Sequence, residues 1–413
     1  MKIAMLSTGE EVLHGDIVDT NAAWLGEYCF EHGFTLTKRS TIGDSLSALT
    51  QELIMLSLNH DVVFVNGGLG PTSDDLSAQA AANANEVELE MNHSWLETLT
   101  ERFAAKGRVV TKSNAKQALL PQGAEMIPNS IGTACGFSML LNRALMFFTP
   151  GVPKEFKLMV KTQIIPFLQQ QFPQHTPLAC SRFYTFGHSE SGLGDLLSAL
   201  QLPEGYFLGY RSALPFIEIK LFGPQGDLET RAKVMALIHN IVKDYTLSID
   251  QSVTQLIGRH LQEKQLTLSL AEQSTFGHLS AWLHDDETAS GQLRHSWLLP
   301  THSLEHDNDA LAGAFALAAA TREKCDTDLS LVTTELDDNH CCAVAMADAS
   351  GEWGGVYQLR VGYSREEQRK VIATIAIDLL RRFLQSQPRF GQYHFIETKR
   401  SLWLPKTAST VLS

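Results

Sequence analysis

The sequence lacks the features that mark several broad classes of protein. Its six cysteines form no CxxC pair, and the only two that are close in sequence, Cys341 and Cys342, are adjacent, so neither a zinc knuckle nor a disulfide framework is predicted. No run of Lys or Arg is present, and 33 basic residues against 46 acidic ones give a net charge of -13. A surface for nucleic acid or for anionic membranes is therefore not expected.

Long apolar segments are also missing. The most apolar stretch, residues 310–320, is rich in alanine and too short to span a bilayer, and the chain starts with a strand-like MKIAML rather than a signal peptide. We expect a cytoplasmic protein whose cysteines are free and mostly buried. The 15 histidines are scattered without a spacing such as HExxH, so a zinc site is not expected.

The residues that are present predict an α/β protein of several domains, since a domain holds on average about 150 residues. Residues 1–170 alternate short apolar strands with amphipathic helices, which predicts a parallel sheet with helices on both faces. Residues 171–250 predict a small α+β domain after a linker at 171–177. Residues 251–413 predict a third α/β domain with a long helix at 364–385 and a weakly patterned tail from Gln387.

The segment with the strongest chemical signal follows a buried apolar strand in the first domain. Gly67, Gly68 and Gly70 allow main-chain N–H groups to approach a phosphate, and the helix expected from about Asp75 would add the positive end of its dipole. Asp74 and Asp75 would repel a bare phosphate, but they could hold a diphosphate through a divalent cation. Helix capping by one of the two aspartates is the competing explanation.

Polar residues also follow the other expected strands of this domain. Glu10, Asp19 and Asn21 follow the first strand, Asp44 follows the second, and Gly151 follows a later one. In a parallel sheet these strand ends meet at one rim, where ligands bind in open α/β sheets. Taken singly, Asp19 and Asp44 are most simply explained as helix caps and Glu10 as a solvated loop residue.

Five motifs, in the same order over about 155 residues, resemble the CinA family. They lie at residues 7–21, 67–75, 114–117, 132–134 and 150–155. The resemblance implies a molybdopterin-binding fold of the MoaB/MogA type, which in CinA proteins is associated with metal-dependent hydrolysis of ADP-ribose to AMP and ribose 5-phosphate. The middle part, with Gly187 and Tyr210, resembles the connecting domain of that family. A homodimer is a further expectation from the resemblance.

On this hypothesis the chain is a hydrolase of a nucleoside diphosphate sugar that requires Mg²⁺, Mn²⁺ or Co²⁺. The expected metal ligands are Asp74 and Asp75, helped by Glu10, Asp19 or Asp44. Diphosphate binding is expected at Gly67, Gly68, Gly70 and Thr72, and the pocket is expected to include Asn21, Asn114 and Gly151. The alternative is a module that binds a pterin or a nucleotide without turnover.

The third domain resembles the CinA C-terminal domain, which in active members deamidates nicotinamide mononucleotide. Glu272, Thr275 and Ser290 match positions of that site, and Ser290 matches the nucleophile. Pro300 and Glu305 stand where the family has tyrosine and lysine, and neither can help to activate a serine as those residues would. Phe276 also replaces a glycine of a tight turn. We therefore expect no amidase activity, and an active amidase remains a disfavoured third hypothesis.

Overall fold

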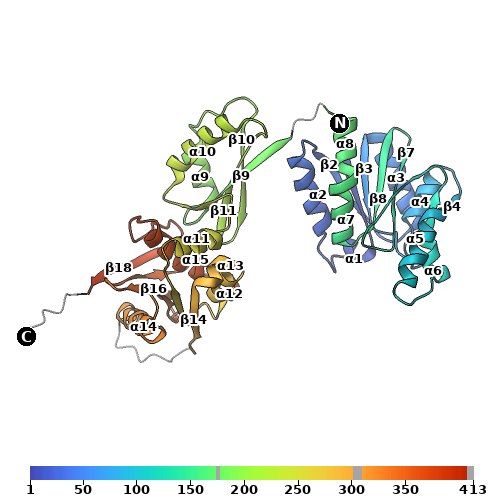
Figure 1. Cartoon of the computed structure of the whole chain (residues 1–413). Coiled ribbons are helices and arrows are strands. Elements are labelled where there is room, and N and C mark those ends of the chain that lie inside the picture. Colours follow the sequence, from blue (N-terminus) through green and yellow to red (C-terminus); the bar gives the residue numbers. More distant parts are fainter. Residues whose placement is uncertain (174–176, 301–308, 407–413) are drawn as a thin grey trace, which may run out of the picture. The chain divides into compact units, whose positions relative to one another are not determined.

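The computed structural model describes residues 1–173, 177–300 and 309–406. The chain divides into two compact units, residues 1–179 and 180–413, and each is described by itself (Figure 1). Part of the linker expected at 171–177, and Glu305, lie outside the described residues. Within the described ranges, no helix is both long enough and apolar enough to cross a membrane.

The first unit is built on a six-stranded sheet in which the first four strands are parallel and the last two are antiparallel additions. The parallel strands were expected, but the antiparallel edge was not. The order of the strands is β2 (Leu36–Ile42), β1 (Ile3–Thr8), β3 (Val62–Asn66), β8 (Ala144–Thr149), β7 (Gly136–Leu141) and β6 (Glu125–Ile127).

Both faces of this sheet are covered by helices, as the apolar runs of the central strands predict. Ile3 and Met5 pack on one face of β1, whereas Ala4 and Leu6 pack on the other. The first face is covered by α2 (Thr20–Glu31), by α7 (Pro153–Met159) and by α8 (Ile165–Gln171). The second face is covered by α3 (Leu46–Asn59), α4 (Ser77–Ala84) and α5 (His93–Ala104).

Short elements complete the first unit. A π-helical turn, Val160–Ile164, joins α7 to α8 just before Pro166, which cannot donate a main-chain hydrogen bond. A 3-10 turn, Lys116–Ala118, leads into β5. The remaining elements are α1 (Glu10–Leu13), β4 (Leu89–Met91), α6 (Lys112–Ala115) and β5 (Leu119–Pro121).

The helix caps decide between two explanations given for the acidic residues. Asp19 caps α2 by accepting a hydrogen bond from Ala22 N at 2.8 Å, as expected. Ser45 rather than Asp44 caps α3. The N-cap position of α4 is Leu76, with no side-chain cap, so neither Asp74 nor Asp75 is used as a helix cap. Capping therefore does not account for the two aspartates beside the glycine turn.

The second unit contains a small four-stranded sheet with two helices on one face. The alternation expected around Ile219 and Leu221 is present in β11 (Phe216–Pro224), and both side chains are buried against Val234 and Ile238 of α10 (Leu228–Val242). The strands follow the order β10 (Phe207–Ala213), β11 (Phe216–Pro224), β9 (Leu178–Thr185) and β12 (Thr246–Ile249). The helices are α9 (Glu190–Leu197) and α10 (Leu228–Val242).

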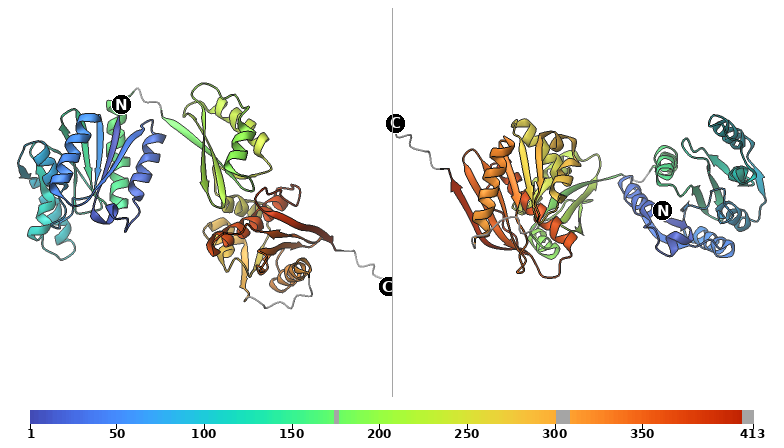
Figure 2. Two further views of the ribbon diagram at one scale, coloured as in Figure 1. Left: turned by 180° about the vertical axis from the view of Figure 1, so that it is seen from behind. Right: turned by 90° about the horizontal axis from the view of Figure 1, so that it is seen from below.

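A second six-stranded sheet completes this unit, with helices on both faces (Figure 2). Its order is β14 (Leu293–Leu298), β13 (Leu268–Glu272), β15 (Leu329–Thr333), β16 (Cys341–Asp348), β17 (Gly351–Gln358) and β18 (Glu397–Pro405). The helices are α11 (Val253–Glu263), α12 (His278–His284), α13 (Glu287–Gln292), α14 (Ala310–Cys325) and α15 (Arg365–Leu384). The strand β14 was not predicted from the sequence, and β18 lies within the tail that was expected to be weakly patterned.

Candidate functional site

A cavity of about 460 Å³ lies where β1, β3 and β8 end in the first unit. These are neighbouring parallel strands, so their carboxyl ends meet at one edge of the sheet, as the strand-end argument expected. Nine of the residues singled out from the sequence line this cavity: Asp19, Asn21, Asp44, Gly67, Gly68, Gly70, Asp74, Asp75 and Gly151.

Three other candidates are placed beside the cavity or away from it. Glu10 exchanges hydrogen bonds with Asp44, since each carboxylate accepts from the main-chain N–H of the other residue, at 3.0 and 3.3 Å. Thr72 lies on the exposed side of the turn and donates its N–H to Asp75 Oδ2 at 2.8 Å. The Asn114 side chain completes the capping box of α6 and does not line the cavity.

The glycine turn requires glycine at its first two positions. Gly67 has φ 108° and Gly68 has φ 67°, conformations that other residues rarely adopt. A Cβ atom at Gly67 would lie 2.6 Å from Thr8 Oγ1, and one at Gly68 would collide with Ser77. At Gly67 and Gly68 the main chain therefore borders the cavity without side chains, which allows a ligand to approach the main chain closely.

The next part of the turn has unpaired hydrogen-bond donors. The N–H of Gly67 donates to Thr149 O, but the N–H groups of Gly68, Leu69 and Gly70 have no acceptor in the described part of the chain. All three residues line the cavity. Successive main-chain N–H groups without protein acceptors form an anion-binding arrangement.

Two buried asparagines hold the rim together. Asn66, at the end of β3, donates from Nδ2 to Pro150 O at 2.7 Å, and its Oδ1 accepts from Asn21 Nδ2 at 2.9 Å. Asn21 Nδ2 also donates to Gly151 O at 2.8 Å. These bonds fix the start of α2, the end of β3 and the turn after β8 relative to one another.

The carboxylates of the cavity are held in different ways. Asp75 is tied into the turn because its Oδ2 accepts from both the N–H and the hydroxyl of Thr72. The polar groups of Thr72 and the main-chain N–H of Asp74 itself, together with the charge of Lys116, lower the pKa of the exposed Asp74. Burial raises the pKa of Asp44, and the charge of Asp74 raises it further, against a main-chain hydrogen bond that lowers it.

The lining of the cavity is strongly acidic. It contains no Lys, Arg or His, and its six carboxylates belong to Glu11, Asp19, Asp44, Asp74, Asp75 and Glu155. The nearby Lys116 is bound to the main chain of the loop, donating to Thr72 O and to Asp75 O, at 2.5 and 2.8 Å. No role was predicted from the sequence for Lys116 or Glu155. An anionic ligand must therefore rely on main-chain N–H groups and on a cation that it brings with it.

The donor set fits one kind of metal ion. Mg²⁺ and similar ions prefer oxygen ligands and are commonly held by one or two carboxylates together with substrate phosphates and water. Asp44 and Asp74 provide such carboxylates at the cavity, and their charges interact. Among the described residues, no group of three or more His, Cys, Asp or Glu side chains could hold a metal alone. The carboxylates of the cavity are therefore of the kind that holds a divalent cation together with substrate phosphates.

The residues that match the amidase site lie in the second unit. There the side chain of Glu272 is bound to the protein itself. This carboxylate is fully buried and accepts hydrogen bonds from Thr275 Oγ1 at 2.6 Å and from three main-chain N–H groups at 2.9 to 3.2 Å. Those N–H groups belong to Gly277, Leu279 and Ser280. Glu272 therefore stabilises the turn that leads into α12.

Ser290 has a neighbour that sequence reasoning missed. Its hydroxyl lies 2.7 Å from His284 Nδ1, so an imidazole is within hydrogen-bond distance of the serine. The two residues lie on different short helices, and no motif signals their contact. Phe276 adopts φ 47°, as a glycine would, and its exposed ring lies under the guanidinium group of Arg369.

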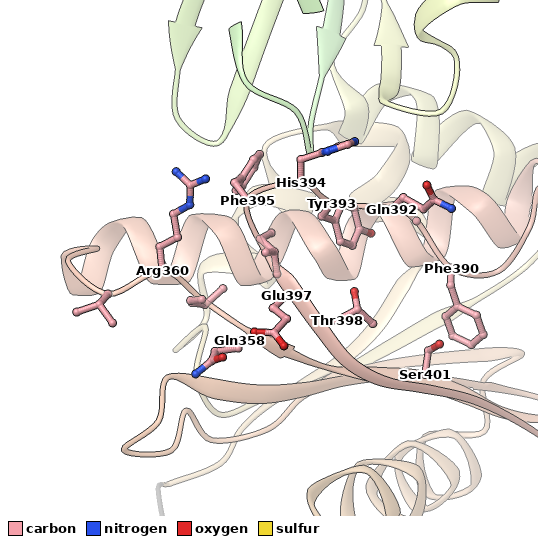
Figure 3. Close-up of a pocket in the computed structure, with 14 residues that line it drawn as sticks. Gln358, Arg360, Phe390, Gln392, Tyr393, His394, Phe395, Glu397, Thr398 and Ser401 are labelled. Carbon is pink, nitrogen blue, oxygen red and sulfur yellow. The ribbon is translucent and has the colours of Figure 1, made fainter. Parts of the chain in front are cut away.

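A larger hollow, of about 950 Å³, lies in the second unit between the end of β17 and the segment that leads into β18 (Figure 3). The hydroxyl of Tyr393 in this segment donates to Asp378 of α15 at 2.8 Å, which anchors the segment to the helix. No residue singled out from the sequence lines this hollow. Its lining includes none of the described polar atoms that are buried without a partner, so we do not assign it a function.

Comparison with known proteins shows the family to which the chain belongs. Residues 4–170 match the family model of a "Probable molybdopterin binding domain". The "CinA-like protein" of Escherichia coli O17:K52:H18 (strain UMN026 / ExPEC) is 41% identical over 411 residues, which cover 98% of this chain and 99% of the relative. The "NMN amidohydrolase-like protein YfaY" of Escherichia coli (strain K12) is 40% identical over the same length and covers the same shares of both chains.

Among solved structures, the protein CinA with unknown function from Thermoplasma acidophilum is 26% identical, with a TM-score of 0.38. It covers 41% of this chain and 96% of its own length. The matches to the two Escherichia coli relatives, in contrast, extend over nearly the whole of both chains. The chain therefore belongs to the family of CinA-like proteins.

Proposed function

We propose that the first unit hydrolyses a nucleoside diphosphate sugar, with ADP-ribose as the expected substrate and AMP and ribose 5-phosphate as products. The observation that carries this proposal is the combination found at Gly68–Gly70. Three main-chain N–H groups there have no acceptor within the described ranges of the chain, and they face a cavity lined by carboxylates and by no described basic side chain. A diphosphate accompanied by a divalent cation satisfies both the free donors and the surplus of negative charge.

The residues of the chain have separate roles in this proposal. The N–H groups of Gly68, Leu69 and Gly70 bind and orient the diphosphate. Asp74, with its lowered pKa, stays ionised, and together with Asp44, whose charge interacts with it, it would hold the cation. Asp75 keeps the loop in shape through Thr72. When bound, a divalent cation would neutralise phosphate charge and lower the pKa of a water molecule.

The test is to incubate the full chain with ADP-ribose and Mg²⁺, Mn²⁺ or Co²⁺, or with EDTA, and to separate the products by chromatography. We expect AMP and ribose 5-phosphate in equal amounts with at least one of these metals and none with EDTA. Asp74→Asn should reduce the rate at least tenfold, because it removes a charge that faces the cation. Asp16→Asn, at an exposed carboxylate that does not line the cavity, should leave the rate unchanged.

A second candidate function is binding without turnover. The description of the matched family model, a molybdopterin-binding domain, and the free N–H groups support it, since an anion site of this kind needs no catalytic group. Calorimetric titration separates the two functions. A binding module would bind ADP-ribose or a pterin without forming product, and Asp74→Asn would leave its affinity within about twofold.

A further inference from the structure

Two buried side-chain oxygens at the cavity have no hydrogen-bond partner among the residues that the structure describes. They are Asn21 Oδ1 and Gln117 Oε1, in side chains that are 6% and 7% exposed. Leaving a buried acceptor unpaired costs roughly 1–3 kcal/mol, so native proteins rarely do so without a functional reason. Both atoms belong to residues that line the same cavity, so donor groups of a ligand bound there would complete both hydrogen bonds.

The orientation of the Asn21 amide is fixed by its neighbours. Pro150 O and Gly151 O can only accept hydrogen bonds, so Asn66 must direct Nδ2 to the first, and Asn21 must direct Nδ2 to the second. Asn66 then presents Oδ1, which again requires Nδ2 of Asn21. Exchanging the oxygen and nitrogen of Asn21 would break two bonds, so its unpaired atom is an acceptor.

Gln117 lies at the junction between the main cavity and a smaller one of about 220 Å³. The two cavities share five lining residues: Gly68, Leu69, Gly70, Asp75 and Gln117. The smaller cavity is otherwise mostly apolar, with side chains that include Leu76, Leu89, Leu119, Leu120 and Cys135. Its two further polar side chains have partners elsewhere, since Gln79 donates to Asn83 and Lys116 donates to the main chain of the loop. It is thus an apolar space directly beside the free N–H groups of the glycine turn, with a carbonyl acceptor at its entrance.

A mostly apolar space with an unpaired acceptor at its entrance suits a flat heterocycle that has an N–H group on its edge. A sugar fits less well, because its hydroxyl groups would face leucine side chains without partners. We infer that this smaller cavity holds the base of the nucleotide and that Gln117 Oε1 accepts a hydrogen bond from an N–H of that base. Asn21 Oδ1 accepts from a donor in the part of the ligand that occupies the main cavity. This inference rests on the proposed function and adds the means by which the base is recognised.

The test combines one substitution with one change in the ligand. Gln117→Met keeps the length of the side chain and removes its acceptor. The ligands are the α,β-methylene analogue of ADP-ribose, which resists hydrolysis, and the same molecule with purine in place of adenine, which lacks the exocyclic amine. Binding is measured by calorimetric titration of the full chain with Mg²⁺ present. Gln163→Met, at a glutamine of the same unit that bonds to Pro128 O, is the matched control.

We expect the wild-type chain to bind the adenine ligand about tenfold more tightly than the purine ligand, as for one neutral hydrogen bond. Gln117→Met should bind both with the weaker affinity, and Gln163→Met should behave as the wild type. The ligand-free Gln117→Met protein should melt at the same or a higher temperature than the wild type, because an unpaired buried acceptor is gone. A glutamine with a structural role would instead lower the melting temperature when replaced.

Three results would overturn the inference. Gln117→Met could discriminate between the two ligands as strongly as the wild type does, or the wild type could fail to discriminate at all. In either case base recognition by Gln117 is wrong, while hydrolysis of the diphosphate stands. Alternatively, the wild-type chain could bind neither ligand, and then the proposed function is wrong as well.

Discussion

Asn21 Nδ2 donates to Asn66 Oδ1 at 2.9 Å and thereby links the first turn of α2 to the end of β3. The two residues are 45 positions apart in the sequence, and both side chains are buried. Through Pro150 O and Gly151 O the same pair of amides also holds the turn after β8. The cavity therefore has a rim that is rigid before any ligand binds, which reduces the entropy lost on binding.

The rim makes a direct prediction for stability. Asn66→Ala should lower the free energy of unfolding by about 2–4 kcal/mol. The substitution removes the acceptor of the Asn21 amide and the donor to the Pro150 carbonyl, and both groups are buried. Scanning calorimetry of the full chain measures this effect as a lower melting temperature. Asn83→Ala on the exposed side of α4 is the control and should cost less than about 0.5 kcal/mol. Equal effects of the two substitutions would contradict the role given to Asn66.

Asp44 provides a prediction with a defined dependence on pH. Burial and the neighbouring acidic residues raise the pKa of its carboxyl in the folded chain, so folding at neutral pH holds an ionised group where its charge is unfavourable. Asp44→Asn should therefore raise the melting temperature at pH 7. The gain should disappear as the pH falls to about 3, where the carboxyl is protonated in both the folded and the unfolded chain.

Melting curves of wild type and Asp44→Asn between pH 3 and pH 8 check this sign. Asp16→Asn, at an exposed carboxylate that does not line the cavity, is the control and should follow the wild type throughout. If Asp44→Asn melted earlier than the wild type at pH 7, the bond from Glu10 N to Asp44 Oδ2 would outweigh the burial and repulsion of the charge.

The sequence predicted those parts of the fold that have a local signal. The central strands β1, β3 and β8 are apolar on both faces, and caps such as Asp19 mark the helix starts. The strand β18 was missed because it is an exposed edge strand, rich in charged and polar residues, which is a strand only by pairing with β17.

The residues of the candidate site also fall into those with a local signal in the sequence and those without one. Strand-end residues such as Asp19, Asp44 and Gly151 could be assigned to one rim, because parallel strands bring their carboxyl ends together. The unpaired atoms of Gln117 and Asn21, and the contact between Ser290 and His284, depend on side-chain packing between distant segments. No spacing in the sequence encodes such an arrangement.

In the second unit, a buried carboxylate between two arginines predicts a large effect. Asp378 is 1% exposed and accepts from Arg381 at 2.7 and 3.0 Å, from Arg382 at 2.8 Å and from Tyr393 at 2.8 Å. Asp378→Asn should destabilise the chain by about 3–5 kcal/mol, because it leaves two buried guanidinium groups without a counter-charge. The control is Asp195→Asn, an exposed carboxylate of α9.

The pH dependence of this effect has the opposite sign to that of Asp44. Burial alone would raise the pKa of Asp378, but the charges of Arg381 and Arg382 outweigh it and lower the pKa. The stabilisation is therefore fully present above the ordinary aspartate pKa, about 3.9, and is lost as the pH falls through the lowered value. Urea unfolding at pH 7 and near pH 2 should show a large difference between the wild type and Asp378→Asn at pH 7 and a small one near pH 2.

The last prediction concerns the amidase-like residues. The full chain, incubated with nicotinamide mononucleotide, should release no ammonia, because Pro300 and Glu305 stand where the family's tyrosine and lysine would assist Ser290. The structure supplies one competing possibility, since His284 Nδ1 lies 2.7 Å from the serine hydroxyl and could accept its proton. An enzymatic ammonia assay with Ser290→Ala, His284→Gln and Asp74→Asn separates the cases. Ammonia release that is lost in the first two variants and kept in Asp74→Asn would show that His284 replaces the missing residues and would contradict the prediction.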